Sequence, residues 1–217
     1  MVKHIIFDCD GVLIDTEIVA AEIVSEYLRS EGSDISTEQF ITEFTGKTFT
    51  DIINSLKVDG RLRADLDTAA VVPKLDDTIR QNQRPINGAI EMLKGLSLPF
   101  SVVSNSARDY VIEALEKLGV LDLVNDRVFS ADMVAKGKPS PLVYKLAVSE
   151  IGLGKNELIV VEDSSAGVTS SLAAGLNTIG FLGGSHIRDG HGQKLMDMGT
   201  SQTINDHTEL SEFFNQI

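Results

Sequence analysis

The sequence predicts an α/β protein in which a helical segment is inserted into a parallel sheet. First, the run 4–7 is short, apolar and β-branched and stops at a polar stretch, which is typical of a buried strand followed by a loop. Second, apolar residues recur at helical spacing between residues 16 and 84, with no convincing strand. Third, strand and helix patterns alternate after Pro85, which indicates parallel strands joined by covering helices. We therefore expect a Rossmann-like core with an all-helical cap.

The inserted segment is predicted to contain helices only. Apolar positions at helical spacing occupy residues 18–28, 36–44 and 50–56. Between residues 60 and 83, Pro73 interrupts a mixed apolar and acidic stretch, and we expect two helices there because proline disrupts a helix interior. The cap is assigned to residues 16–84, and the core domain to residues 1–15 and 85–217.

The remaining elements follow in alternation. The expected order is helix 89–96, strand 100–104, helix 109–118, strand 128–129, helix 142–151, strand 158–162, helix 166–174 and strand 178–181. Ser140-Pro141 is a typical helix start. Gly119, Gly152 and Gly175 each follow a helical stretch, where a left-handed residue commonly ends a helix. Local signals and the alternating pattern therefore agree.

The composition restricts the partners and the location. The chain of 217 residues has 19 Lys and Arg against 32 Asp and Glu, a formal net charge of -13 at pH 7, which would repel a nucleic-acid backbone. Cys9 is the single cysteine, and the first ten residues resemble neither a signal peptide nor a membrane span. We expect a cytoplasmic monomer with no nucleic-acid or membrane partner.

Polar side chains gather where the predicted strands end. The carboxyl ends of parallel strands meet at one edge, where helix N-termini add positive dipoles. The residues expected there are Asp8, Asp10, Ser104, Asn105, Glu162 and Asp163, with Lys138 in the loop before a helix. Two or three aspartates around a phosphate would repel it unless cations intervene. The edge is therefore predicted to bind a phosphate together with a divalent cation.

Oxygen ligands without histidine or cysteine favour Mg²⁺ over zinc. Asp8, Asp163 and a backbone carbonyl of the Asp10 turn are the candidate ligands. The Lys138 ammonium is expected to contact the phosphate, and Glu162 is expected to orient Lys138 or a metal-bound water. Two further residues, Ser104 and Asn105, are expected to complete the anion cradle with backbone N–H groups.

The spacing of Asp8 and Asp10 predicts a mechanism. Residues i and i+2 of a strand face the same way, so both carboxylates can reach one substrate, and Gly11 allows a sharp turn directly afterwards. We expect Asp8 to attack phosphorus and Asp10 to protonate the leaving oxygen and then activate water. Cys9 is expected to face the opposite side as a small buried residue.

The sequence resembles a known superfamily in four ordered motifs. They are DCDGVLIDTE at 8–17, Ser104-Asn105, GKPSP at 137–141 and Glu162-Asp163-Ser164. Together they resemble the haloacid dehalogenase superfamily, in its β-phosphoglucomutase and phosphatase branch with a helical cap. The resemblance implies an aspartyl-phosphate enzyme with nucleophile Asp8 and acid/base Asp10. It also implies phosphate binding by Ser104, Asn105 and Lys138, and Mg²⁺ on Asp8, the Asp10 carbonyl and Asp163.

The cap departs from the mutases that the chain resembles. Those mutases carry a histidine on the first cap helix and an arginine after the cap's glycine loop, and here the aligned positions are Ala20 and Phe49. Lys47 is the cap residue that could still contact a second anionic group. The favoured function is therefore hydrolysis of a small phosphomonoester, either a sugar phosphate or a nucleotide.

Two alternatives to hydrolysis stay open. The first is a phosphomutase of the β-phosphoglucomutase type. The second is a non-enzymatic phosphoacceptor or interaction module, which is less favoured because receiver modules place the acceptor on a middle strand and have no cap. All four histidines are expected to lie outside the site, and they are His4, His186, His191 and His207.

Overall fold

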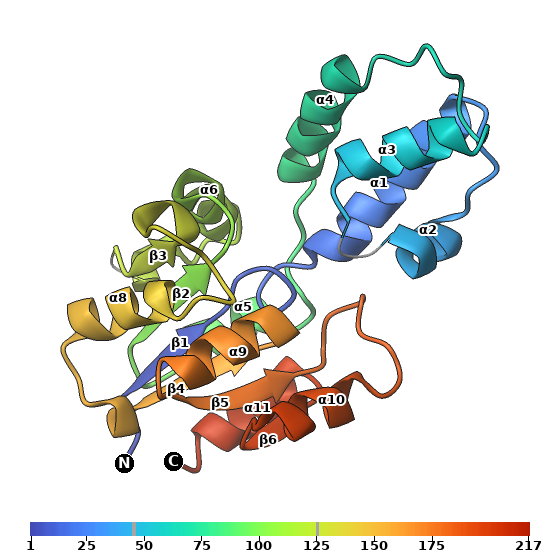
Figure 1. The fold of residues 1–217 in the computed structure, drawn as a ribbon. Coiled ribbons are helices and arrows are strands. Elements are labelled where there is room, and N and C mark those ends of the chain that lie inside the picture. Colours follow the sequence, from blue (N-terminus) through green and yellow to red (C-terminus); the bar gives the residue numbers. More distant parts are fainter. Residues whose placement is uncertain (45–46, 125) are drawn as a thin grey trace. The chain divides into compact units, whose positions relative to one another are not determined.

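A six-stranded sheet forms the larger unit of the protein. The computed structural model describes residues 1–44, 47–124 and 126–217. The strands are β1 (His4–Phe7), β2 (Phe100–Ser104), β3 (Val128–Ser130), β4 (Leu158–Glu162), β5 (Asn177–Phe181) and β6 (Gln202–Ile204), in the spatial order β3-β2-β1-β4-β5-β6 (Figure 1). Every neighbouring pair is parallel. The predicted fold class, a Rossmann-like parallel sheet, is confirmed.

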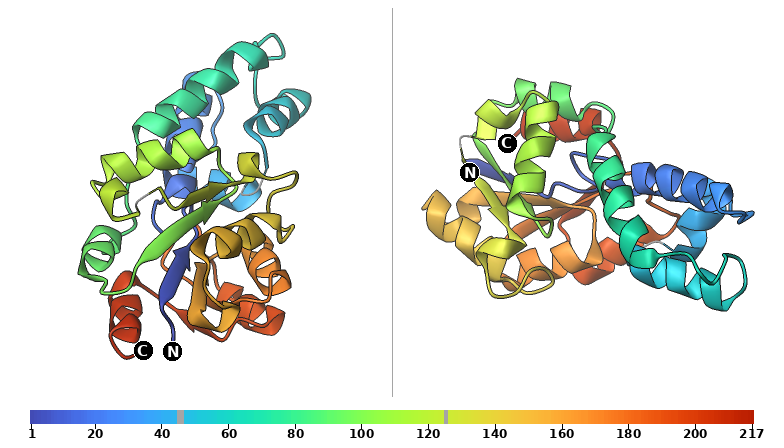
Figure 2. Two further views of the ribbon diagram at one scale, coloured as in Figure 1. Left: turned by 90° about the vertical axis from the view of Figure 1, so that its left-hand side faces the viewer. Right: turned by 90° about the horizontal axis from the view of Figure 1, so that it is seen from above.

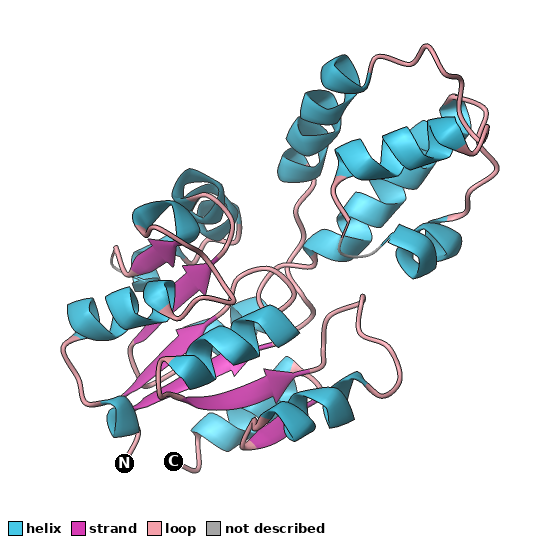
Figure 3. Cartoon of the chain, viewed as in Figure 1, coloured by secondary structure: helices cyan, strands magenta, loops and turns pink. Residues whose placement is uncertain are grey.

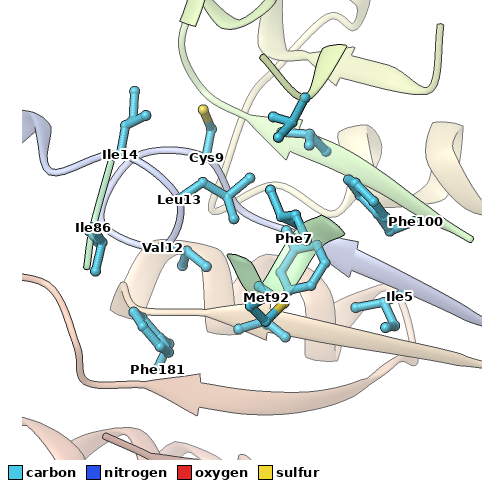
Figure 4. Close-up of a cluster of buried hydrophobic side chains, with 14 of the residues drawn as sticks. Ile5, Phe7, Cys9, Val12, Leu13, Ile14, Ile86, Met92, Phe100 and Phe181 are labelled. Atoms are coloured by element: carbon cyan, nitrogen blue, oxygen red, sulfur yellow. The ribbon is translucent and has the colours of Figure 1, made fainter. Parts of the chain in front are cut away.

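The two faces of β1 bury different side chains, because successive residues of a strand point in opposite directions. Ile5 and Phe7 join a core cluster that also contains Cys9 and Met92 (Figure 4), while Ile6 joins a second cluster. Phe7 packs edge-to-face on Phe100, with ring centroids 5.7 Å apart. Since β1 is also paired with β2 on one side and β4 on the other, its carboxyl end lies in the middle of the sheet edge.

Helices cover both faces of the sheet (Figures 2 and 3). Cluster and contact patterns place α5 (Ala89–Gly95), α6 (Arg108–Lys117) and α11 (His207–Phe214) on one face, and α8 (Leu142–Ile151), α9 (Ser165–Ala173) and α10 (His191–Met198) on the other. Shorter elements are α7 (Leu121–Val124) and the 3₁₀ turns Ala131–Met133 and Lys155–Glu157. Both chain ends lie near each other at the same end of this unit (Figure 2).

The segment after Phe181, where no element was expected, contains three. It forms α10, β6 and α11. Leu195 is the buried residue of α10 and Ile204 that of β6, so neither element shows enough apolar repeats to reveal its period. Short elements of this kind depend on packing against neighbours rather than on their own pattern.

The second compact unit comprises Thr16–Arg84, and the first comprises Met1–Asp15 with Pro85–Ile217. The helices of the second unit are α1 (Thr16–Ser30), α2 (Thr37–Phe44), α3 (Phe49–Val58) and α4 (Thr68–Gln81). They enclose a separate hydrophobic cluster that includes Val24, Ile53 and Leu56. Among the described residues 16–44 and 47–84, no strand is present. This unit therefore has a core of its own.

The expectation of two helices between residues 60 and 83 is wrong. This region holds a single helix, α4 (Thr68–Gln81), and Pro73 lies inside it. Asp67 caps it by accepting a hydrogen bond from the Ala70 N–H, and Leu75 and Ile79, four residues apart, are buried. Because Pro73 lies in the second turn, the helix loses one backbone hydrogen bond there, and capping and burial outweigh that loss.

Two buried histidines of the sheet unit make stability depend on pH. Burial lowers the pKa of His4 to about 4, with a smaller effect of Arg127, and burial also lowers the pKa of His207 to about 4. An unfolded chain protonates both near pH 6.5, at the ordinary pKa of histidine (roughly 6.5). Below that pH the unfolded state binds more protons, so the free energy of unfolding falls as the pH decreases from about 6.5 toward 4.

We expect urea unfolding to show this loss, at up to about 1.4 kcal/mol per pH unit for each histidine. His4→Gln removes one titrating group and keeps an amide for Ser101, whose Oγ lies 3.1 Å from His4 Nε2. The variant should lose less stability than the native chain between about pH 7.5 and pH 5.5. Equal losses in the two proteins would contradict this assignment.

Candidate active site

Lys138 joins the ends of three strands at the carboxyl edge of the sheet. Its Nζ lies 2.7 Å from Asp8 Oδ1, 2.6 Å from Glu162 Oε1 and 3.0 Å from the carbonyl oxygen of Val103. Asp8 follows β1, while Val103 and Glu162 belong to β2 and β4, the two neighbours of β1. Four predicted site residues, Asp8, Lys138, Glu162 and Asp163, are thus buried at one edge of the sheet.

The loop that carries Lys138 is held by Asn105. The Lys138 N–H donates to Asn105 Oδ1 at 2.7 Å, and Asn105 Nδ2 donates to the Lys138 carbonyl at 3.1 Å. A Cβ on Gly137 would lie only 2.6 Å from Asn105 Oδ1, so glycine is required for this close approach. Asn105, predicted to bind phosphate, therefore also orients the lysine.

Burial and charge act together on the titrating groups of this edge. Burial raises the pKa of Asp8 well above its usual range, as does repulsion from Glu162 and Asp163, while Lys138 opposes the shift. Burial alone would lower the pKa of Lys138, but the carboxylates of Asp8 and Glu162 raise it above its ordinary value. The Lys138 ammonium therefore contacts two of the three buried carboxylates, those of Asp8 and Glu162.

The residues at this edge fit a hard divalent cation. Ligand oxygens of Asp8, Glu162 and Asp163 lie within 4.8 Å of one another. Within the described part of the chain, Asp163 Oδ1 is buried and has no hydrogen-bond partner, which is costly for a carboxylate unless a cation faces it. An all-oxygen donor set of this kind suits Mg²⁺. Glu162 is less available as a ligand, since Lys138 and the Tyr144 hydroxyl both donate to its Oε1.

Asp10 is bound by two serine hydroxyls from the end of β2. Its Oδ2 accepts hydrogen bonds from Ser104 Oγ at 3.2 Å and Ser106 Oγ at 2.8 Å. Ser104 Oγ also accepts the N–H of Ser106 at 2.9 Å. Ser104 was a predicted site residue, whereas Ser106, only two residues further along, was not. Tyr144, in α8, is also missed, and no signal in the sequence could have identified it.

The expectation that all four histidines lie outside the site is wrong for two of them. His186 Nε2 lies 3.0 Å from Asp163 Oδ2, and His191 Nε2 lies 2.6 Å from the carbonyl oxygen of Asp163. Both follow β5, whose carboxyl end reaches the same edge of the sheet, so their place after a strand was the available signal. His4 and His207 bind Ser101 and the Val12 carbonyl instead.

The cap residues singled out in the sequence have local roles in the second unit. Ala20 is buried in the apolar cluster of that unit, and Phe49 packs against it. Lys47 is exposed, with its ammonium 5.2 Å from the centroid of the Phe44 ring. Its proposed contact with substrate therefore stays a prediction.

Gly167 in α9 is predicted to be intolerant of substitution. A Cβ at this position would lie 1.9 Å from Glu162 Oε2, inside the buried carboxylate that holds Lys138. We expect Gly167→Ala to lower the free energy of unfolding by about 1–3 kcal/mol, as overpacked sites do. Gly95→Ala is the matched control, because its Cβ would meet nothing within 4 Å. Comparable stability of both variants in urea unfolding would contradict this packing argument.

The fold and the edge together define an α/β protein with a buried cluster of carboxylates where the strands end, which could hold a cation. The chain belongs to the haloacid dehalogenase-like hydrolase family, whose family profile matches residues 5–181. The resemblance deduced from the four motifs is thereby confirmed, and so is the expectation of an enzyme of the hydrolase type.

Several relatives of known name are similar over most of the chain. A 6-phosphogluconate phosphatase of Escherichia coli is 26% identical, with 85% of each chain covered. A validoxylamine A 7'-phosphate phosphatase of Streptomyces hygroscopicus is 32% identical, with 83% of this chain and 86% of the relative covered. Among solved structures, a haloacid dehalogenase family hydrolase of Deinococcus radiodurans, with bound phosphate and sodium, is 27% identical. Its TM-score is 0.85, and the match covers 96% of this chain and 93% of the other.

Proposed function

We propose that this protein is a Mg²⁺-dependent phosphatase that hydrolyses a small phosphomonoester through an aspartyl-phosphate on Asp8. The observation that carries the proposal is the buried cluster in which Lys138 contacts Asp8 and Glu162 while Asp163 keeps an unpartnered oxygen. A lysine and a cation facing the same carboxylate are what a doubly charged phosphate needs to approach an anionic nucleophile.

Asp8 is the proposed nucleophile. Its Oδ1 already accepts hydrogen bonds from Lys138 Nζ and the Cys9 N–H, so we assign the attack to Oδ2. This oxygen forms a bond to phosphorus as the bond from phosphorus to the ester oxygen breaks. The electron pair of the broken bond goes to the ester oxygen, and Asp10 supplies a proton to it.

Asp10 acts a second time when the aspartyl-phosphate is hydrolysed. Its carboxylate takes a proton from water as the water oxygen bonds to phosphorus, and the bond between phosphorus and Asp8 breaks to restore the carboxylate and release phosphate. The hydroxyls of Ser104 and Ser106 hold Asp10 Oδ2 in place for both transfers. Ser104 and Asn105 remain the proposed phosphate contacts, together with Lys138.

The carboxylates of Asp8 and Asp163 and the backbone carbonyl of Asp10 would hold the Mg²⁺. When bound, Mg²⁺ neutralises negative charge on the phosphoryl oxygens and on the carboxylates. Glu162 serves as the counter-charge of Lys138, because its Oε1 is 2.6 Å from both Lys138 Nζ and the Tyr144 hydroxyl oxygen.

A sugar phosphate is the favoured substrate class, in keeping with relatives that are phosphatases of phosphorylated carbohydrates, such as one from Thermotoga maritima at 27% identity. A mutase would have to hold a substrate with phosphate at both ends. Ala20, at the position where mutases carry a histidine, is instead part of the apolar cluster of its unit. Lys47 remains the candidate contact to a second anionic group. Hydrolysis is therefore proposed in preference to phosphate migration.

A substrate panel tests this proposal. Phosphate release would be measured with sugar phosphates, polyol phosphates and nucleoside monophosphates, with Mg²⁺ present and after its removal by a chelator. We expect turnover of at least one sugar phosphate, its loss on chelation and its return on adding Mg²⁺. Turnover unchanged by chelation, or no turnover of any phosphomonoester, would contradict the proposed function.

A further inference from the structure

Two histidines from one segment contact a single residue of the site. His186 lies between β5 and α10, and His191 is the first residue of α10. The Nε2 atom of His186 is 3.0 Å from Asp163 Oδ2, and that of His191 is 2.6 Å from the Asp163 backbone carbonyl oxygen. One histidine therefore holds the carboxylate of Asp163, and the other holds its backbone.

The direction of both hydrogen bonds follows from the acceptors. A carbonyl oxygen only accepts, so Nε2 of His191 must carry the proton. An ionised carboxylate likewise only accepts, so Nε2 of His186 must be the donor. Both hydrogen bonds therefore run from an imidazole N–H to an oxygen of Asp163.

The contacts determine which oxygen of Asp163 stays available. Oδ2 accepts from His186, and it also lies close to Gly11, where a Cβ would be only 2.0 Å away. Oδ1 is buried and has no partner among the described residues. A carboxylate held on one oxygen in this way presents the other oxygen to a cation in one orientation. In metal sites such outer partners maintain the orientation of a ligand.

The segment that carries His186 is itself anchored. The Ser185 hydroxyl donates to Asp15 Oδ2, and the Ser185 N–H lies 3.4 Å from Asp15 Oδ1. Asp15 is buried, at 9% exposure, and belongs to the same compact unit. The imidazole of His186 is therefore held against Asp163 by a fixed backbone, and does not depend on an unrestrained loop.

We propose that His186 and His191 are positioning residues that clamp Asp163 and so orient its Oδ1 for the divalent cation. This inference rests on the proposed function, because it assumes that Asp163 is a cation ligand. Neither histidine is assigned a contact with substrate or a proton transfer. Their loss should weaken cation binding first, and lower turnover only through that weakening.

Direct titration of Mg²⁺ by calorimetry tests the clamp without any substrate. Gln places an amide nitrogen close to the position of Nε2, whereas Asn is too short to reach Asp163 with its amide. We therefore expect His186→Gln to retain most of the affinity. His186→Asn and His186→Ala should weaken Mg²⁺ binding by about 10–100-fold, the usual effect of losing an outer partner of a metal ligand. At His191, the Gln variant should likewise bind Mg²⁺ more tightly than the Asn variant.

Gln193→Ala is the matched control, because Gln193 is exposed on α10 and binds only Asp197 among the contacts described for it. It should bind Mg²⁺ like the native chain. Circular dichroism identifies variants that fail to fold. If His186→Ala fails to fold, the comparison of His186→Gln with His186→Asn still decides the question. Equal Mg²⁺ affinity of His186→Gln and His186→Asn would overturn the clamp. Absence of Mg²⁺ binding in the native chain would instead contradict the proposed function.

For folded variants that bind Mg²⁺ weakly, a saturating concentration of the metal should restore phosphate release. A merely structural role would not show this recovery, because added metal does not replace a lost packing contact. Turnover that stays low at saturating Mg²⁺ would contradict the assignment of both histidines as positioning residues for the cation.

Discussion

Asp8→Asn should lower phosphate release by at least about 10⁴-fold, the scale of loss when a covalent nucleophile is removed. The amide has nearly the shape of the carboxylate but is a far weaker nucleophile toward phosphorus. Because Asp8 is 6% exposed and faces Lys138 at 2.7 Å, the variant also loses one charge of a buried pair. Steady-state phosphate release and acid-quench labelling of the protein with a radioactive phosphoester would be measured together.

The labelling experiment separates chemistry from folding. The native chain should carry a transient acid-stable phosphoryl group, and Asp8→Asn should carry none. Asp206→Asn provides the control, since Asp206 caps α11 through the N–H groups of Thr208 and Glu209 and an asparagine still caps a helix. Labelling of folded Asp8→Asn at the native level would remove Asp8 as the nucleophile.

Lys138→Met should abolish turnover and lower the free energy of unfolding by about 3–5 kcal/mol, the range for breaking a buried ion pair by removing one partner. The Lys138 side chain is 3% exposed, and that of Glu162 is fully buried. Without the ammonium, Glu162 and Asp8 would be left as buried charges facing each other. Urea unfolding in the absence of divalent metal, and phosphate release in its presence, would measure the two effects.

The double variant Lys138→Met, Glu162→Gln isolates the electrostatic part of this loss. The Glu162→Gln substitution removes the unpaired charge, and the amide oxygen can still accept the hydrogen bond from the Tyr144 hydroxyl. The double variant should therefore be more stable than Lys138→Met and remain inactive, because no ammonium is restored. If the second substitution lowered stability further, the loss in Lys138→Met would not come from an uncompensated charge.

The pattern of strands and helices explains how far the sequence could predict this protein. β2, β4 and α8 agree with the expected residue ranges, because each combines a strong apolar pattern with clear end signals. The prediction that Pro73 separates two helices failed, because the N-cap hydrogen bond of α4 and its buried side chains outweigh the effect of the proline. It also missed β6 and α10, which have too few buried residues to show a period, and α11, whose buried Leu210 and Phe214 are four residues apart.

In the candidate site, too, some features could be predicted from the sequence and others could not. The alternation of Asp8, Cys9 and Asp10 predicts two carboxylates on one side of a strand end and the thiol on the other, and Cys9 is fully buried among core residues. No local pattern could show that Tyr144 donates to Glu162, and the place of His186 after β5 indicated the sheet edge but not its contact with Asp163. Those contacts join side chains of separate elements and depend on how the covering helices and loops pack.

The sequence by itself determined the parallel sheet class, the superfamily and the residue types that end each strand, because these depend on near neighbours along the chain. Only the tertiary structure decided that Lys138 contacts Asp8, 130 residues away, and that two histidines hold Asp163. The reason is that such contacts require several strands to converge at one sheet edge. Their geometry follows from the packing of the whole unit and not from the spacing within any one segment.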